Sequence, residues 1–213
     1  MSSPADPDRY LSVEDGPETE LKVKGSRFLG RVFRIASADE AHGRLQSLRK
    51  RHHSATHHCW ASRLGLPESP TERFDDDGEP SGTAGRPILN QLLGVDVHDT
   101  LVVVTRYFGG AKLGTGGLAR AYGDAAAMAL DAAPKRVVLR EARLSLECGF
   151  DDVGAVEACV ARAGSDVHRV ERAYDPSPNL TLFVRRSRAE VIAAAIVEAT
   201  AGRAKVIRSH DSW

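Results

Sequence analysis

Residues 101–118 read LVVVTRYFGGAKLGTGGL, and this stretch decides the fold of the first half of the chain. Its first part, Leu101 to Tyr107, is rich in β-branched and apolar residues, which is typical of a buried strand. The glycines between Gly109 and Gly117 then let the backbone adopt positive φ angles in a loop. A helix is predicted from about Leu118 to Ala132, because Pro134 cannot continue it. A buried strand that leads through a glycine loop into a helix indicates a mixed α+β domain.

The sequence before this stretch supplies the other elements of the same domain. Ser37 and Glu40 form an S-x-x-E capping box, which opens a predicted helix that runs to about Lys50. Residues 68–87 are rich in Gly, Pro and Asp, and they predict a long loop followed by a short helix. Alternating or apolar segments predict three further strands: Glu20 to Val23, Ser26 to Ile35 and Ala55 to Arg63.

The sequence after Pro134 predicts a regular succession of strands and helices. Ser187 and Glu190 form a second capping box there. The predicted order is βαββαβ. Its elements are Arg143 to Cys148, a helix capped by Asp151 or Asp152 that runs to about Ala163, Val167 to Tyr174, Leu180 to Val184, Ser187 to about Ala201 and Lys205 to Arg208. This is the order of a ferredoxin-like domain. We therefore expect an α+β protein with one domain over residues 17–136 and a ferredoxin-like domain over residues 140–213.

Composition and the first residues bear on localisation. Hydrophobic residues make up 42% of the chain and charged residues 27%, as in globular proteins. The longest strongly apolar run, Leu101 to Thr105, is far shorter than the roughly 20 residues that span a bilayer, so no membrane association is expected. Residues 1–16 lack the apolar segment of a signal peptide and predict a disordered leader. We expect a cytoplasmic protein that is a monomer or a weak homo-oligomer.

The charges balance overall but are unevenly distributed. Lys and Arg number 29, as do Asp and Glu, which argues against a tight, non-specific nucleic-acid binder. Between Lys22 and Arg51, however, nine basic residues face only two acidic ones. Phe28 and Phe33 interleave with arginines there, a pattern that can stack nucleic-acid bases. The simpler interpretation is a half-buried strand with a charged outer face.

The glycine loop is a candidate anion site, because backbone N–H groups and a helix N-terminus both attract phosphate or carboxylate. The Walker pattern fails, since Thr115 stands where lysine is required. A G-x-G-x-x-A fit begins at Gly114, but no acidic residue follows at the spacing of a dinucleotide site. The alternative is a tight connection whose glycines serve packing. The candidate residues are Arg106, Gly109, Gly110, Lys112, Gly114, Gly116, Gly117 and Arg120.

The acidic loop Phe74 to Gly85 is a second candidate. Clustered carboxylates favour calcium or magnesium, but the EF-hand spacing fails, because Arg86 stands where the bidentate glutamate belongs. Asp77 and Glu79 are an alternative general acid/base pair. A solvated, glycine-rich loop is the third interpretation, and we expect no metal. The candidate residues are Asp76, Asp77, Glu79, Ser81 and Thr83.

The segment Arg51 to Trp60 contains four histidines and a cysteine. On a strand, His57 and Cys59 share one face, which invites zinc or a His–Cys nucleophile. A closed zinc site needs four ligands, and the other two cysteines, Cys148 and Cys159, belong to the second domain. No orienting acid is evident for a nucleophile. A strand whose polar face meets the acidic loop is the simpler interpretation. No catalytic residue is assigned, and no cofactor is expected.

Three blocks in order, together with His57-His58-Cys59, carry a family resemblance. They are GSRF at Gly25 to Phe28, DDGEPSGTAG at Asp76 to Gly85, and TRYFGGAKLGTGGL at Thr105 to Leu118. With these motifs, the chain resembles the IMPACT family, in its bacterial YigZ-like form, over about Glu18 to Leu130. Arg27, which lies in the first block and in the basic segment, is a further candidate residue beside His57 and Cys59.

The resemblance implies a fold and a role. The first domain would have the fold of the fourth domain of elongation factor G and of a ribosomal protein, and the second would resemble that factor's ferredoxin-like fifth domain. Eukaryotic relatives modulate translation through the amino-acid-starvation kinase pathway. The main hypothesis is therefore a non-enzymatic protein that binds RNA or the ribosome weakly. The alternatives are a sensor or enzyme for a small anionic metabolite or nucleotide, and a protein-interaction module. A separate hypothesis is that Asp76, Glu79, Arg106 and Lys112 lie together.

Overall fold

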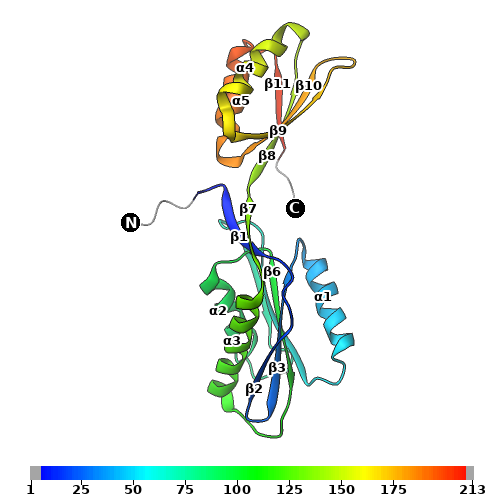
Figure 1. Cartoon of the computed structure of the whole chain (residues 1–213), viewed down its shortest axis with the longest axis vertical. Helices are drawn as coiled ribbons and strands as arrows, with labels where there is room; N and C mark the ends of the chain where they lie inside the picture. The colour runs from blue at the N-terminus through cyan, green and yellow to red at the C-terminus, as the bar shows by residue number, and fades with distance from the viewer. Residues whose placement is uncertain (1–5, 210–213) are drawn as a thin grey trace, which may run out of the picture. The chain divides into compact units, whose positions relative to one another are not determined.

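The computed structural model describes residues 6–209 (Figure 1). In this part of the chain, residues 10–138 form one compact unit, and residues 139–209 together with residues 6–9 form the other. The division falls between Val138 and Leu139. These residues lie in the segment Pro134 to Glu141, where the sequence predicts the boundary between the two domains. No helix among the described residues is long and apolar enough to span a bilayer.

The first unit is built on a five-stranded antiparallel sheet with the order β2-β3-β6-β4-β5. The central strand β6 is almost completely buried, as its β-branched sequence predicts. Phe28, Val32, Val102 and Val104 face one side of the sheet, and Phe33, Leu101 and Val103 face the other. The strands are β2 (Thr19–Val23), β3 (Ser26–Arg34), β4 (His57–Leu64), β5 (Thr71–Asp75) and β6 (Thr100–Tyr107).

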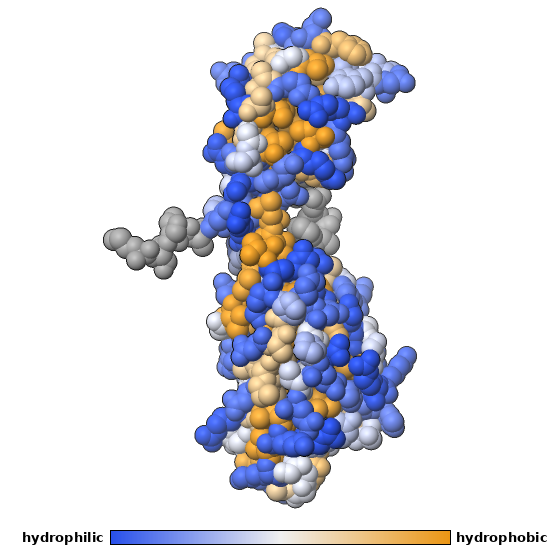
Figure 2. Space-filling view, in the orientation of Figure 1, coloured by the Kyte–Doolittle hydropathy of each residue, from blue (hydrophilic) through white to orange (hydrophobic). Residues whose placement is uncertain are grey.

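Helices cover both faces of this sheet (Figure 1). Helices α2 (Gly85–Val95) and α3 (Gly114–Ala132) pack on the Phe28 side, and α1 (Ala38–Arg51) packs on the Phe33 side. One half of the expected capping box of α1 is confirmed, because the Glu40 backbone N–H donates to Ser37 Oγ at 3.1 Å. The Glu40 carboxylate accepts from the Ala36 N–H at 2.9 Å instead of from the N–H of Ser37. On the face that Figure 2 shows, hydrophilic side chains predominate, with apolar patches between them.

The N-terminal residues differ from the predicted disordered leader. Residues 9–13 form strand β1 (Arg9–Val13), which pairs with β7 (Lys135–Leu139) in a two-stranded sheet. The Tyr10 hydroxyl donates to Asp99 Oδ2 at 2.6 Å, and the Ser12 hydroxyl donates to the His98 carbonyl at 2.9 Å. These partners lie almost ninety residues away, so no local pattern reveals them. Residues 1–5 of the expected leader lie outside the described residues.

The loop predicted over residues 68–87 also contains structure that the sequence did not show. Strand β5 pairs with β4 at the edge of the sheet, with Trp60 opposite Asp75 and Leu64 opposite Thr71. All five residues of β5 are exposed. An edge strand without a buried face has no alternation of apolar and polar residues, and this is why it was missed.

The second unit has the βαββαβ element order that the sequence predicts. Its four strands form an antiparallel sheet in the order β11-β8-β10-β9. One core cluster joins the buried residues of these strands, such as Leu144 and Leu182, to Val156 and Ile196 of the helices. The elements are β8 (Glu141–Glu147), α4 (Val153–Ala163), β9 (Val167–Ala173), β10 (Asn179–Arg185), α5 (Ala189–Ala199) and β11 (Lys205–Ser209).

The second predicted capping box, at Ser187 and Glu190, is wrong. Helix α5 begins at Ala189, and its N-cap residue Arg188 makes no capping hydrogen bond through its side chain. Ser187 instead binds Asp8, because its hydroxyl donates to Asp8 Oδ2 at 2.6 Å and its N–H donates to Asp8 Oδ1 at 2.8 Å. Arg185 similarly pairs with Asp6 at 2.9 Å. A long-range carboxylate therefore replaces the local cap.

Candidate functional site

The three sequence motifs meet around the side chain of Arg106, near the end of β6. In the sheet register, Arg106 lies between Phe28 on β3 and His57 on β4. Its side chain follows Val102 and Val104 on the face that α2 and α3 cover, because residues two apart on a strand point the same way. The acidic loop reaches this face through Glu79, which is buried.

Arg106 and Glu79 form a buried ion pair. Arg106 Nη1 donates to Glu79 Oε1 at 2.5 Å, and the two side chains are only 6% and 4% exposed. The Tyr122 hydroxyl of α3 donates to the same oxygen at 2.7 Å, and Arg106 Nη2 donates to Ser26 Oγ at 3.4 Å. His57 Nε2 lies 3.8 Å from that carboxylate oxygen. We call these five residues, Ser26, His57, Glu79, Arg106 and Tyr122, the Arg106 cluster.

Aromatic rings enclose the guanidinium of Arg106. Its central carbon lies 5.4 Å from the ring centroid of Phe28 and 5.5 Å from that of Phe108. A cation this close to ring faces gains a favourable interaction with their π electrons. The charge of Arg106 is therefore balanced inside the protein. The sequence predicted that Arg106 binds phosphate. In the structure its side chain lies in the interior and contacts residues of the other motifs.

Burial favours the protonated forms of the Tyr122 hydroxyl and the Cys59 thiol. Burial raises the pKa of the Tyr122 hydroxyl, and the neighbouring Cys59 and Glu79 raise it further. Burial likewise raises the pKa of the Cys59 thiol, whose Sγ donates to the Asp76 carbonyl at 3.0 Å. Because only the thiolate is a strong nucleophile, this fully buried thiol does not fit the His–Cys interpretation.

Asp76 holds the start of α2 in place. Its carboxylate accepts the backbone N–H groups of Gly82 at 2.8 Å, Ala84 at 2.9 Å and Gly85 at 2.8 Å. Burial opposes ionisation of this carboxyl, but the three backbone donors outweigh it and lower the pKa of Asp76. The first carboxylate of the acidic loop thus caps a helix that has no cap from its own N-cap residue, Ala84.

Replacing Asp76 with alanine is expected to lower the free energy of unfolding by about 2 kcal/mol near neutral pH, because three N–H groups lose their acceptor. A depressed pKa means that the ionised form stabilises the folded state. This stabilisation is complete above the ordinary aspartate pKa of 3.8 and is lost as the pH falls through the lower folded value.

Urea unfolding of wild type and Asp76→Ala over a series of pH values measures this effect. The difference between the two proteins should shrink as the solution is acidified. Ser81→Ala, an exposed residue of the same loop without an ionisable side chain, is the matched control. A difference that stays constant down to the most acidic pH would contradict the role given to the Asp76 carboxylate.

Asp77 links the acidic loop to β4 and α1. Its carboxylate accepts from Arg49 Nη2 at 2.6 Å and from the backbone N–H of His58 at 2.7 Å. Its carbonyl accepts from His57 Nδ1 at 2.7 Å, and because a carbonyl only accepts, Nδ1 carries the proton. Asp77 and Glu79 therefore have separate partners, which does not fit a general acid/base pair sharing one substrate.

Thr83 and Ser81 are the remaining polar candidates of this loop. The Thr83 hydroxyl donates to the Pro80 carbonyl at 2.6 Å, and Ser81 is exposed. Within residues 6–209, no three His, Cys, Asp or Glu side chains gather as metal ligands do. The interpretation of a strand whose polar face meets the acidic loop matches the contacts of His57 and His58 with Asp77.

The glycine loop divides into a packed part and an open part. Gly109 lies against the turn between β2 and β3, where a Cβ on it would sit 1.9 Å from the Gly25 carbonyl carbon. Its N–H also donates to Ser26 Oγ at 3.2 Å. Gly110 and Gly114 have positive φ angles of 86° and 71°, and nothing lies within 4 Å of a Cβ built on either. Packing therefore explains Gly109, whereas the positive φ angles explain Gly110 and Gly114.

The open part leads into α3, which begins at Gly114, earlier than predicted. Its N-cap residue Leu113 makes no capping hydrogen bond through its side chain, and its first turn carries no acidic residue. Lys112 is exposed on the loop. Gly116 and Arg120 line a shallow groove of about 350 Å³ between α2 and α3. Gly117 leaves less space for a side chain, because a Cβ there would lie 3.2 Å from Leu113 Cβ.

The expected cleft of Asp76, Glu79, Arg106 and Lys112 does not form as one open site. Glu79 and Arg106 pair with each other in the interior. Asp76 turns to the start of α2, and Lys112 stays exposed on the glycine loop. These residues therefore lie in three separate environments: the interior, the start of α2 and the exposed glycine loop. Arg27 is elsewhere again, on the outer face of β3, paired with Glu20 at 2.9 Å.

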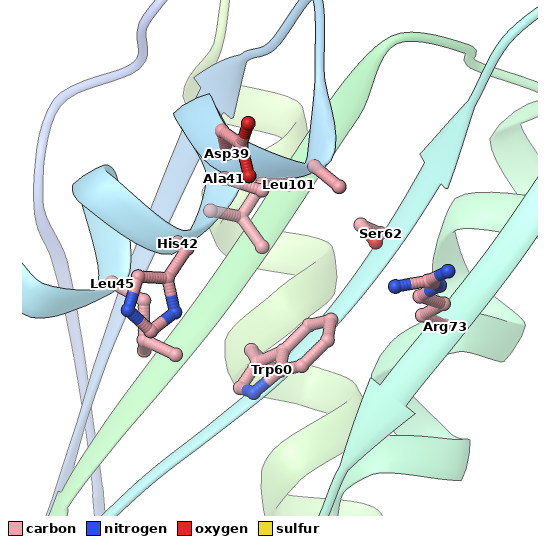
Figure 3. Close-up of a pocket in the computed structure, with 9 residues that line it drawn as sticks. Asp39, Ala41, His42, Leu45, Trp60, Ser62, Arg73 and Leu101 are labelled. Carbon is pink, nitrogen blue, oxygen red and sulfur yellow. The ribbon is translucent and has the colours of Figure 1, made fainter.

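A pocket of about 300 Å³ between α1 and β4 was not predicted (Figure 3). Trp60 and Ser62 of β4 and Arg73 of β5 form one side, and Asp39 and His42 of α1 form the other. In Figure 3, the Trp60 indole lies between the helix and Arg73. The strand alternation could have indicated which side chains line this pocket. Trp60 and Ser62 alternate with the buried Cys59 and Ala61, so they face away from α2 and α3.

Comparison with known proteins agrees with these motifs. Residues 24–130 match the family described as the Impact N-terminal domain. An IMPACT family member of Haemophilus influenzae is 30% identical over 195 residues, which cover 91% of this chain and 94% of that protein. The family member YigZ of Escherichia coli is 35% identical over 147 residues, which cover 68% of this chain and 72% of YigZ.

A solved structure extends the likeness to nearly the whole chain. The crystal structure of a hypothetical protein matches with a TM-score of 0.68 at 29% sequence identity, and the match covers 94% of this chain and 97% of the other. The matched family segment includes all three motifs that meet at the Arg106 cluster. This chain therefore belongs to the IMPACT family and resembles its member YigZ.

Proposed function

We propose that this protein modulates translation in the cytoplasm by binding RNA or the ribosome weakly, without catalysing a reaction. The observation that carries the proposal is the open start of α3. Backbone N–H groups of the first helical turn have no side-chain cap, and the exposed Lys112 stands beside them. A helix N-terminus with a nearby cation attracts phosphate groups.

The family supports a role in translation. The resemblance to the family implies such a role, because eukaryotic relatives modulate translation, and the implied likeness to the fourth and fifth domains of elongation factor G favours a ribosomal or RNA partner. The zero net charge limits the strength of such binding. We therefore expect an interaction that depends strongly on salt, because counterions released from phosphates supply most of its free energy.

The alternative of a metabolite sensor or enzyme receives less support from the contacts. It requires the carboxylates of the acidic loop to be available to a ligand, whereas Asp76, Asp77 and Glu79 all bind groups of the protein. The alternative of a protein-interaction module stays a prediction, and a partner retained after nuclease treatment would favour it over RNA binding.

Fluorescence anisotropy of a labelled single-stranded RNA over a salt series tests the proposal. For single strands, the slope of log K against log salt is about −0.7 for each phosphate neutralised. We expect a slope of about −2 or steeper for the wild type and a shallower slope for Lys112→Ala. Lys205→Ala, an exposed lysine of the second unit, is the control. Absence of binding even at low salt would contradict the proposal.

A further inference from the structure

Three arginines from the basic segment line one small pocket. Arg31 comes from β3, and Arg44 and Arg51 lie two turns apart on the same side of α1. The pocket has a volume of about 170 Å³. We call it the arginine pocket; its lining residues are Arg31, Phe33, Arg44, Ser47, Leu48 and Arg51.

Two of these guanidinium groups lack a negative partner. Arg44 pairs with Asp15 at 3.0 Å and with Glu40 at 3.4 Å. Within the described part of the chain, neither Arg31 nor Arg51 pairs with a carboxylate. Arg31 Nε is also buried without any hydrogen-bond partner. The pocket therefore holds uncompensated positive charge and an unused donor.

Phe33 holds the arginines in position. The guanidinium carbons of Arg31 and Arg44 lie 5.2 Å and 5.4 Å from the centroid of its ring. The ring itself is only 5% exposed, so it is not a platform for nucleic-acid bases. Phe28 is fully buried as well. The base-stacking interpretation of the basic segment is therefore not supported, whereas its charges remain available.

The nearby acidic residues hydrogen-bond to groups other than Arg31 and Arg51. Glu20 of β2 pairs with Arg27 at 2.9 Å and with Lys22 at 3.6 Å. Glu18, just before β2, lies 3.0 Å from His52 Nε2. The hydrogen-bonding groups of Arg31 and Arg51 are therefore left to bind an anion from solution.

We propose that the arginine pocket binds a phosphate group of an RNA backbone. The planar fork of arginine matches phosphate oxygens in two-point hydrogen bonds, and arginines held rigidly lose little entropy on binding. The pocket is too small for a nucleotide but suits a single phosphate, with bases left outside. This inference deepens the proposed function and rests on it.

A chain of phosphates fits the surroundings of the pocket better than a single acidic side chain. Lys50 is exposed next to Arg51 at the end of α1. This further cation beside the pocket provides a contact for a neighbouring phosphate. Such contacts position a nucleic acid without reading its sequence.

The test compares RNA binding by the full-length wild type, Arg31→Gln/Arg51→Gln and the charge-preserving Arg31→Lys/Arg51→Lys. The probe is a labelled oligouridylate in the anisotropy salt series. We expect the glutamine variant to bind roughly tenfold more weakly at low salt, with a slope shallower by about 0.7, the value for one phosphate. The lysine variant should keep the slope and recover only part of the affinity.

A second measurement reports on the pocket itself. Adding the oligouridylate or inorganic pyrophosphate to ¹⁵N-labelled protein should shift the Nε–H resonance of Arg31, because this buried donor gains an acceptor. Thermal unfolding followed by circular dichroism checks that each variant stays folded. An Arg31 resonance that does not move with either probe would overturn the assignment.

The remaining outcomes separate this inference from the proposed function. If RNA binding is unchanged in Arg31→Gln/Arg51→Gln but weaker in Lys112→Ala, the arginine pocket is excluded and the proposed function stands. If the wild type binds no RNA at low salt, both fail, and a response to pyrophosphate alone would identify a site for free phosphate. An acidic peptide that displaces RNA and shifts Arg31 equally well would replace the phosphate assignment with a protein partner.

Discussion

Replacing Gly109 with alanine is expected to destabilise the first unit by about 3 kcal/mol or more. The added Cβ would lie 1.9 Å from the Gly25 carbonyl carbon, 2.1 Å from its oxygen and 2.2 Å from the Ser26 nitrogen. All three are backbone atoms, so no side chain can rotate away. Overpacking costs of about 1–3 kcal/mol apply where side chains can adjust, and a backbone clash exceeds them.

Gly116→Ala is the matched control in the same motif. Nothing lies within 4 Å of a Cβ on Gly116, which sits in the first turn of α3. Alanine there should stabilise the protein by about 0.5–1 kcal/mol, since alanine favours the helix over glycine. Urea unfolding followed by circular dichroism compares the variants. Equal effects at the two glycines would mean that Gly109 does not pack against the turn between β2 and β3.

Removing Glu79 is the second change with a large expected effect. Glu79→Ala leaves the charge of Arg106 buried without its carboxylate and removes the acceptor of the Tyr122 hydroxyl. Breaking a buried ion pair from one side costs about 3–5 kcal/mol, because the remaining charge is uncompensated. We expect a loss of that size in the free energy of unfolding, measured in urea.

Two further variants make this prediction specific. Glu72→Ala removes a carboxylate on exposed β5, 3.4 Å from Arg63, and should cost less than about 1 kcal/mol. The double variant Glu79→Gln/Arg106→Met removes both charges of the buried pair and should be more stable than Glu79→Ala. A double variant that is less stable than Glu79→Ala would show that the cost does not arise from an unpaired charge.

The elements with a strong local signal are those that the sequence predicted well. The apolar run of β6, the glycines after it and the helix ended by Pro134 appear in the structure in the predicted order. The capping box at Ser37 has its expected backbone contact. Strands β1 and β5 were missed for opposite reasons. The buried side of β1 depends on His98 and Asp99, which are distant in sequence, whereas β5 has no buried side.

The roles of the site residues depended even more on distant partners. Asp76, Asp77 and Glu79 look alike as a cluster of carboxylates, yet each has a different function in the fold. Asp76 caps α2, Asp77 binds Arg49 and the backbone of β4, and Glu79 neutralises Arg106. Composition shows that acidic groups are concentrated here but not which cation or N–H group each one meets.

The contacts of residues 6–9 have a consequence for the order of synthesis. Asp6 and Asp8 bind Arg185 and Ser187, so the second unit combines two segments that lie on either side of the first unit in the sequence. These two aspartates leave the ribosome 179 residues before their partners. The first unit has all of its residues once Val138 has emerged. The second unit therefore forms its contacts with Asp6 and Asp8 only after the first unit has been synthesised.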